Sequence, residues 1–172
     1  MAAALAELSD LLARTVDRLQ AAAVPDEALA TVKRARGLTG LSGASRMVPA
    51  GRVWRLGVLL LDATGRLYAT GGVTRAIVPL RAVTNRSAAA EERREDRRSA
   101  ARGPFPEGEV VNFGYTALAL DTAALEAGSG PLSVRDGVVM VRWSDGDATL
   151  GIRELSEYLA DRVGLLVEDP IG

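Results

Sequence analysis

The chain has 172 residues, of which 48 % are hydrophobic and 25 % charged, a composition typical of a globular protein that can bury a core. It contains neither cysteine nor histidine, which excludes disulfides, thiolate metal sites, cysteine nucleophiles and the commonest general base. The formal net charge is −1 and aromatic residues are only 4 %, so we expect no surface that stacks nucleic-acid bases, no metal site and no cofactor.

The ends and the overall hydropathy point to a cytoplasmic protein without a membrane partner. No run approaches the roughly 18–20 apolar residues that span a bilayer. The apolar start at residues 1–6 is followed at once by Glu7 and Asp10, unlike a signal peptide. Arginine provides nearly all of the basic residues, as is typical of a GC-rich bacterial genome.

The first 36 residues predict a pair of helices. Apolar residues from Leu5 to Leu19 recur at the spacing of an amphipathic helix over 3–23, which Pro25 ends. A second, shorter helix is predicted over 26–36, between Pro25 and Gly37. Residues 38–51 are rich in glycine and serine and predict a glycine-rich connection, as an ordered loop or a flexible linker.

Residues 53–62 and 66–78 predict two paired strands, joined by a three-residue loop with Gly65 in the left-handed conformation. The register that this loop sets places Leu60 opposite Tyr68 and Leu56 opposite Gly72. Both faces are apolar near the turn, so the hairpin is expected to be covered on both sides.

The same register predicts a candidate anion site. It sets Gly57 opposite Gly71, and paired strand glycines leave room for a ligand or another backbone, or mark a bulge. Two guanidiniums beside such a recess can hold a carboxylate or phosphate, and a polar side chain near a strand end can line it. The candidate residues are Arg55, Arg75, Gly57, Gly71 and Asn112. The alternative is a bulge with the two arginines paired to acids of the C-terminal half.

Residues 87–102 predict a helix that Gly103 and Pro104 stop. The helix is charged on both sides: Glu91, Glu92, Glu95 and Asp96 occupy one half of its circumference, and Arg93, Arg94, Arg97 and Arg98 the other. One interpretation is a solvated surface helix. The other is an interaction helix, because an antiparallel copy across a two-fold axis would place a basic half opposite the acidic half and an acidic half opposite the basic half.

The remaining elements complete an α+β fold. Residues 109–120 predict a strand, 132–135 and 138–143 a hairpin around Asp136-Gly137, and 152–163 a final helix. We expect one domain over 1–172, with a helical pair at 1–36, the connection at 38–51 and a sheet-containing core at 52–167. The sheet is predicted to be mostly antiparallel with about five strands, two hairpins plus one strand, packed with helices.

Charge is unevenly distributed along the chain. Residues 1–103 carry a net charge of +7 and residues 104–172 a net charge of −8, while residues 33–86 hold ten basic residues and a single acid, Asp62. A basic block of this kind is typical of nucleic-acid binding. The whole chain is acidic, with a pI near 5.6, which disfavours a nucleic-acid partner. The other interpretation is that the two halves neutralise each other, within one fold or across a homodimer.

Four stretches carry a resemblance to a known family: residues 54–61, 69–76, 111–115 and 140–144. Together they resemble a family of short uncharacterised proteins from high-GC bacteria, some of which carry the label glutaminase. The label implies catalytic residues that this chain lacks. Glutaminases with a Ser-x-x-Lys pair would need a serine three residues before Lys33, where this chain has Ala30. Amidotransferases with a catalytic triad would need cysteine and histidine, which the chain lacks. No catalytic residue is carried over from the resemblance.

The sequence therefore predicts a non-enzymatic, cytoplasmic α+β protein that acts through self-association, as a homodimer, or through partner binding. One alternative is a small-molecule anion binder or amide hydrolase, and a further one is RNA binding through residues 33–86. The first uses the charged helix, the second the Arg55–Arg75 recess, and the third the basic block.

Overall fold

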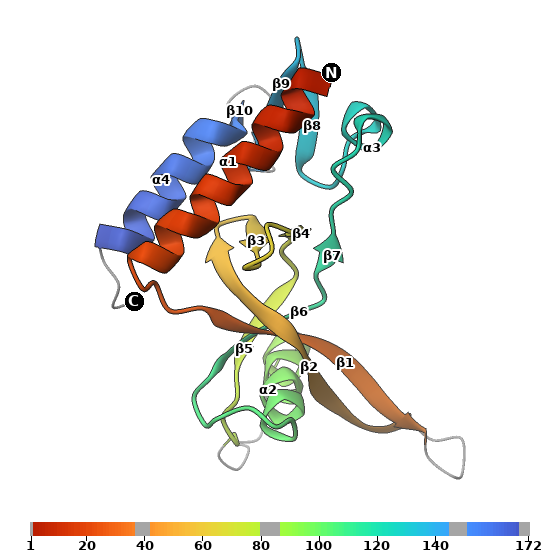
Figure 1. The fold of residues 1–172 in the computed structure, drawn as a ribbon. Coiled ribbons are helices and arrows are strands. Elements are labelled where there is room, and N and C mark those ends of the chain that lie inside the picture. The colour runs from red at the N-terminus through yellow and green to blue at the C-terminus, as the bar shows by residue number, and fades with distance from the viewer. Residues whose placement is uncertain (1, 37–41, 80–86, 145–150, 169–172) are drawn as a thin grey trace. The chain divides into compact units, whose positions relative to one another are not determined.

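The computed structural model describes residues 2–36, 42–79, 87–144 and 151–168 (Figure 1). In chain order its elements are α1 (Ala2–Ala21), β1 (Glu27–Arg36), β2 (Ser42–Leu56), β3 (Leu59–Leu61), β4 (Leu67–Ala69), β5 (Gly72–Arg75), α2 (Ala88–Ala101), β6 (Val110–Phe113), β7 (Thr116–Ala117), α3 (Thr122–Ala127), β8 (Leu132–Arg135), β9 (Val138–Arg142), β10 (Ile152–Glu154) and α4 (Leu155–Glu168).

The fold is α+β, as predicted, but its sheets are larger. A seven-stranded mixed sheet has the order β5-β6-β1-β2-β3-β4-β7, and a three-stranded sheet has the order β10-β9-β8. Among the described strands, β1 pairs with β6 in parallel and every other pair is antiparallel. The expectation of about five strands is therefore wrong, because several segments predicted as helix or loop pair as strands.

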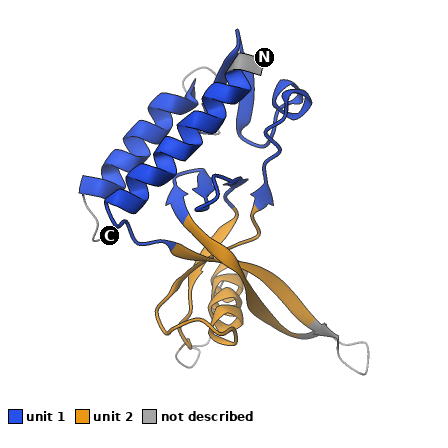
Figure 2. Cartoon of the chain, viewed as in Figure 1, with its two compact units in different colours: residues 1–26, 54–70, 116–172 blue, residues 27–53, 71–115 orange. Residues whose placement is uncertain are grey.

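The chain forms two compact units, each assembled from separate segments (Figure 2). Unit 1 comprises Met1–Asp26, Trp54–Thr70 and Thr116–Gly172, and unit 2 comprises Glu27–Val53 and Gly71–Tyr115. Each unit buries its own apolar cluster, one around Leu12, Leu59 and Leu159 and the other around Ala30, Met47 and Val111. The prediction of a single domain over 1–172 stays a prediction.

Unit 1 contains the elements that the sequence predicts best. The amphipathic helix is present as α1, with Leu8, Leu12 and Leu19 buried. The second predicted hairpin is present as β8 and β9, and Asp136 and Gly137 adopt the positive φ angles that a two-residue turn of this kind requires. In both cases the pattern lies within a short stretch of sequence, which is why it predicts the element.

The final helix begins later than predicted. Residues 152–154 pair with β9 as the edge strand β10, and α4 starts at Leu155. Leu155, Leu159 and Val163 are buried as expected. The short helix α3, with Asp121 Oδ1 accepting from the Ala124 N–H at 3.0 Å, was not predicted.

The prediction of an N-terminal helical pair is wrong for the second helix. Residues 27–36 form β1, although alanine, leucine, lysine and arginine are good helix formers. Ala28 and Ala30 are buried between β2 on one side and β6 on the other, so strand pairing overrides the local preference.

The predicted connection over 38–51 is also wrong where the structure describes it. Residues 42–51 belong to the 15-residue strand β2, and residues 38–41 lie outside the described part of the chain. The glycines and serines that suggested a loop are accommodated because β2 pairs with β1 along most of its length.

The first hairpin is confirmed near its turn and wrong farther away. Leu60 pairs with Tyr68, and Gly65 has a φ of +81° as predicted. The chain then turns back at Gly57, so Leu56 pairs with Leu59 and not with Gly72. Residues 72–75 instead pair with β6 as strand β5. A second tight turn inside the first predicted strand therefore changes every partner beyond it.

The predicted strand over 109–120 is interrupted. Gly114, with a φ of +62°, separates β6 from β7, and the two strands pair in different parts of the fold. The charged helix is confirmed as α2, with the Ser87 hydroxyl accepting from the Ala90 N–H at its N-terminus.

Candidate functional site

The five residues of the predicted anion site are distributed over both units. Arg55 in β2 and Gly57 in the β2–β3 turn belong to unit 1, whereas Gly71, Arg75 and Asn112 belong to unit 2. The register that paired Gly57 with Gly71 does not form. Anion binding by this set stays a prediction.

The space beside each of the two glycines is filled by the protein's own atoms. A β-carbon at Gly71 would lie 2.2 Å from the carbonyl oxygen of Gly114, so this glycine permits a close approach of two backbone segments. A β-carbon at Gly57 would lie 2.1 Å from Oη of Tyr158. At Gly71 the expected approach of another backbone is therefore present, formed by Phe113 and Gly114.

Asn112 is fully buried in β6, and its side chain forms hydrogen bonds to the neighbouring strand β1. Its Nδ2 donates to Oε2 of Glu27 at 2.7 Å and to the Ala28 carbonyl at 3.3 Å. The Glu27 carboxylate beside it would repel an anion. Arg75 is exposed, and its Nη1 donates to the Gly108 carbonyl at 3.3 Å.

Several charges of helix α2 are matched within unit 2. Arg98 contacts both Glu91, at 3.0 Å, and Glu95, at 3.3 Å, and Arg102 pairs with Glu95. Arg94 is 5 % exposed. Glu92, Arg93 and Arg97 are exposed and Asp96 is half-buried. Fewer of the eight residues are thus available to a partner than the sequence implied, and the interaction role of the helix stays a prediction.

Charge is also segregated between the two compact units, nearly as strongly as between the two parts of the sequence. Unit 2 holds 13 arginine and lysine residues against seven acids, a net charge of +6. Unit 1 holds eight against 15, a net charge of −7. The acids that make the whole chain acidic therefore belong largely to a separate compact unit.

A two-stranded ribbon forms part of the basic unit. Only Ala28–Ala30 of β1 pair with β6. From Thr31 onward, β2 is therefore the one strand that pairs with β1 among the described residues. The paired segments 31–36 and 42–48 extend over about 20 Å at a strand's usual rise. In Figure 1 the two strands continue together, with no third strand beside them, to the end of their described residues.

The two faces of this ribbon differ. Met47 and Ser45 lie on one face, where Met47 is fully buried and the Ser45 hydroxyl donates to Oε1 of Glu95 on α2 at 3.1 Å. Alternation along the strand places Lys33 and Arg46 on the opposite face. These two residues are directly paired across the strands, and both are exposed.

The Lys33–Arg46 pair is a pair of like charges. Neighbours that face each other across an antiparallel ladder have β-carbons about 5 Å apart, and like charges there are destabilising. No acid forms an ion pair with either residue in the part of the chain that the structure describes. Arg34, one residue along β1, is a third exposed cation on the ribbon.

Helix α2 holds the ribbon in place. Nε of Arg102 donates to the Ser45 carbonyl at 2.7 Å, while Glu95 receives the Ser45 hydroxyl. Burial acts to raise the pKa of Glu95, but hydrogen bonds from Arg102, Ser45 and Arg98 outweigh it and lower that pKa. Glu95 is therefore ionised at neutral pH, and the charged helix positions the strand that carries Arg46.

Sequence reasoning included Lys33, Arg34 and Arg46 in its basic block but did not single them out. The sequence carries no signal for the pair, because residues 27–36 are mostly good helix formers and the register that sets Lys33 opposite Arg46 depends on the pairing of β1 with β2. Among the described residues, no group of three acidic side chains is placed to hold a metal ion, and no helix is long and apolar enough to cross a membrane.

Comparison of the chain with protein-family models, with curated proteins and with solved structures gave no match.

Proposed function

We propose that this protein binds the phosphate backbone of duplex DNA through the β1–β2 ribbon, with Lys33 and Arg46 as the central contacts. The observation that carries the proposal is the exposed pair of like charges, which forms no ion pair with an acid among the described residues. Such a pair is unfavourable alone and becomes favourable when an anion bridges both cations.

The segregation of charge removes the main argument against a polyanionic partner. The acidic pI of the whole chain disfavoured nucleic acid, but a ligand at the ribbon meets a unit whose net charge is +6. The local potential around a binding surface governs the attraction of a polyanion more than the total charge does.

The shape and composition of the ribbon favour duplex DNA over other nucleic acids. The major groove of B-DNA admits a two-stranded β-ribbon, whereas the deep, narrow major groove of duplex RNA does not. Proteins that bind single strands use aromatic side chains as stacking platforms. Residues 31–36 and 42–48 contain no aromatic residue, so recognition rests on phosphates and is independent of base sequence.

The test is a titration of a labelled DNA duplex with the full-length chain, followed by fluorescence anisotropy at several salt concentrations. The variant Lys33→Ala with Arg46→Ala should bind more weakly, and its salt slope should be smaller by about 1.8 because two phosphate contacts are lost. The matched control is Arg14→Ala with Arg18→Ala, which removes two exposed cations from α1 in unit 1 and should leave binding unchanged.

Three results would reject the proposal in different ways. Absence of binding to duplex DNA at low salt would reject nucleic-acid binding. An equal loss in the α1 control would reject the ribbon as the contact surface. Tighter binding of duplex RNA or of single-stranded DNA would reject the choice of duplex DNA. Thermal unfolding of each variant checks that its fold is intact.

Self-association is a second candidate function, favoured by the opposite net charges of the two units. A basic unit of one copy and an acidic unit of another attract each other, and this attraction weakens as salt shortens the Debye length. Sedimentation velocity at low and high salt tests this candidate. A monomer under both conditions would remove it, and a dimer that the ribbon variant dissociates would assign the same cations to a second copy.

A further inference from the structure

Strand β5 forms one edge of the seven-stranded sheet, because β6 is its one neighbour in the order of the described strands. Three large apolar side chains are exposed at this edge and just after it, those of Val73, Ile77 and Val78, and Val73 is 49 % exposed. Edge strands of natural proteins are usually protected by charges, by proline or by a covering segment. Exposed β-branched residues on an edge therefore indicate a surface that a further strand covers.

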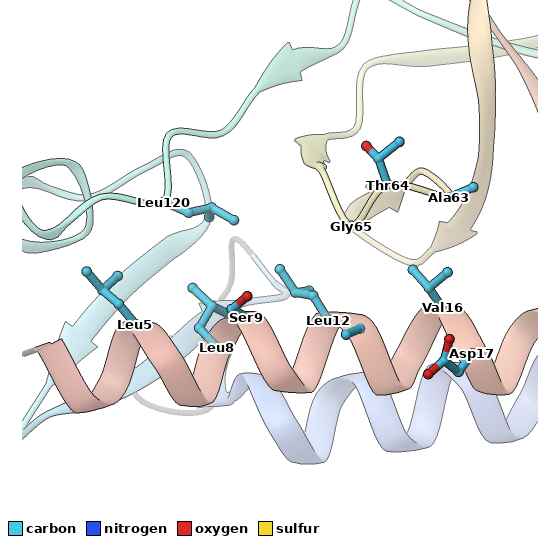
Figure 3. Close-up of a pocket in the computed structure, with 11 residues that line it drawn as sticks. Leu5, Leu8, Ser9, Leu12, Val16, Asp17, Ala63, Thr64, Gly65 and Leu120 are labelled. Atoms are coloured by element: carbon cyan, nitrogen blue, oxygen red, sulfur yellow. The ribbon is translucent and has the colours of Figure 1, made fainter.

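The exposed side chains at β5 contrast with apolar residues that the chain itself covers. In unit 1, Leu12 and Val16 of α1 point toward the β3–β4 turn (Figure 3), and both are buried. In unit 2, a β-carbon at Gly72 would meet the ring of Phe113, which packs against the apolar cluster that includes α2. Successive side chains of a strand alternate between its faces, so Val73 lies on the face of β5 that α2 does not cover.

The backbone of β5 has hydrogen-bonding groups that point away from β6. The Ala76 N–H, directly after the strand, donates to the Glu109 carbonyl at 2.9 Å and so faces β6. Along an extended strand these groups point alternately to either side, which directs the backbone groups of Val73 and Arg75 to the open edge. The Ile77 N–H donates to the Arg75 carbonyl at 2.8 Å. The Arg75 N–H and both groups of Val73 therefore face the position of a further strand.

The charge beside this edge is positive. Arg75 lies on the same face of β5 as Val73 and is exposed. Its Nη1 donates to the Gly108 carbonyl at 3.3 Å, and the guanidinium has further N–H donors that suit a carboxylate. No acid within the described ranges forms an ion pair with Arg75, and unit 2 has a net charge of +6. A second copy pairing through β5 would bring another basic unit to the edge, whereas an acidic segment is attracted to it.

We infer that β5 binds an extended acidic peptide segment of another protein, which adds a strand antiparallel to it. In this mode of recognition, main-chain hydrogen bonds provide affinity and alternate side chains provide specificity. An acidic residue of the segment lies opposite Arg75, and an apolar residue two positions later lies opposite Val73. Read from its N-terminus, the segment therefore has an acidic residue, any residue and an apolar residue in succession.

The probe is the peptide acetyl-Val-Thr-Glu-Thr-Val-Thr-amide, whose glutamate and second valine match this pattern. NMR spectroscopy of the isotope-labelled full-length chain measures its affinity and the hydrogen exchange of single amides. Exchange should slow at Val73 and Arg75 when the peptide binds, because their N–H groups then donate to it. Exchange at Thr74 should change little, since alternation directs its N–H to β6.

Two modified peptides test the backbone contact. N-methylation of the second valine removes the N–H that donates to the Val73 carbonyl and should weaken binding about tenfold. The matched control carries the methyl group on the threonine between glutamate and valine, whose N–H points away from β5. This control peptide should bind more tightly than the valine-methylated one.

Charge reversal tests the chemistry of the partner. A peptide with lysine in place of glutamate should bind about two- to thirtyfold more weakly, because like charges directly opposite each other are destabilising. Arg75→Glu should reverse this preference, so that the lysine peptide binds the variant more tightly than the glutamate peptide does. Arg93→Glu, at an exposed position on α2 of the same unit, changes the net charge equally and should not reverse it.

The inference fails if the glutamate peptide does not bind the full chain, if exchange at Val73 and Arg75 is unchanged by it, or if the two methylated peptides bind equally. It also fails if Arg75→Glu keeps the wild-type preference. Protection of Val73 and Arg75 that rises with the concentration of the chain alone would assign the edge to a second copy and overturn the inference. The ribbon segments 31–36 and 42–48 are not part of this edge, so these outcomes leave the ribbon proposal unaffected.

Discussion

The hydroxyl of Tyr158 occupies the space that a β-carbon at position 57 would need. Gly57 has a φ of +64°, and an added β-carbon would lie 2.1 Å from Oη of Tyr158. The same hydroxyl donates to the Leu56 carbonyl at 3.0 Å and accepts from the Val58 N–H at 2.9 Å. A side chain of α4 therefore clamps the tight turn between β2 and β3, and the turn depends on glycine for both its conformation and its space.

Gly57→Ala should destabilise the protein strongly. The left-handed backbone costs about 1–2 kcal/mol for a residue with a β-carbon, and overpacking against Tyr158 adds about 1–3 kcal/mol. Chemical denaturation measures the loss. The matched control is Gly164→Ala in α4, where a β-carbon meets nothing within 4 Å. That change should stabilise by about 0.8–1.0 kcal/mol, because glycine is the poorer helix former. A neutral Gly57→Ala would contradict the clamp.

Tyr158→Phe should cost about 1–3 kcal/mol, because it leaves the buried Leu56 carbonyl without this donor and removes the acceptor for Val58. Combined with Gly57→Ala, it should be less harmful than the sum of the two single changes, since removing Oη relieves the closest contact. A double-mutant cycle measures this coupling, expected to be about 0.5–3 kcal/mol. Strict additivity would show that the two residues do not interact.

Asp62→Ala should lower stability by about 1–3 kcal/mol at neutral pH. Burial acts to raise the pKa of Asp62, but hydrogen bonds from Thr64, the Arg66 N–H and the Tyr68 hydroxyl lower it below its ordinary value of 3.8. A lowered carboxyl pKa contributes stability that is complete above the unfolded-state value and is lost as pH falls through the folded-state value. The difference between wild type and variant should therefore narrow below about pH 4, and a constant difference would oppose this account.

Asp96→Asn should instead stabilise the protein slightly at pH 7. Burial raises the pKa of Asp96, and the carboxylates of Glu92 and Glu95 raise it further. Removing one like-charge neighbour on a helix is worth about 0.2–0.5 kcal/mol. Because the folded-state pKa is raised, wild type regains this energy as pH falls and Asp96 becomes protonated, so the two proteins should converge in acid. Urea denaturation at pH 7 and near pH 4 tests both the sign and the convergence.

Local signals predicted those elements whose stability depends on their own residues. The leucine stripe of α1, the Asp136-Gly137 turn and the Gly103-Pro104 stop after α2 are each encoded within a short stretch of sequence. The positions of the candidate anion-site residues were harder to predict. The pairing of Gly57 with Gly71 required the register set at the Gly65 turn to continue through both strands. One unrecognised turn at Gly57 was enough to separate these residues.

The sequence by itself determined the α+β class, the absence of thiol and imidazole chemistry and the uneven distribution of charge, since composition and short-range pattern suffice for these. Only the tertiary structure decided that residues 27–36 are a strand, because Ala28 and Ala30 are buried between β2 and β6, partners that come from distant parts of the chain. That same pairing set Lys33 opposite Arg46 and placed both in the unit that holds 13 of the 21 arginine and lysine residues. Cross-strand neighbours are fixed by long-range burial, and no local preference of helix-forming residues could have indicated them.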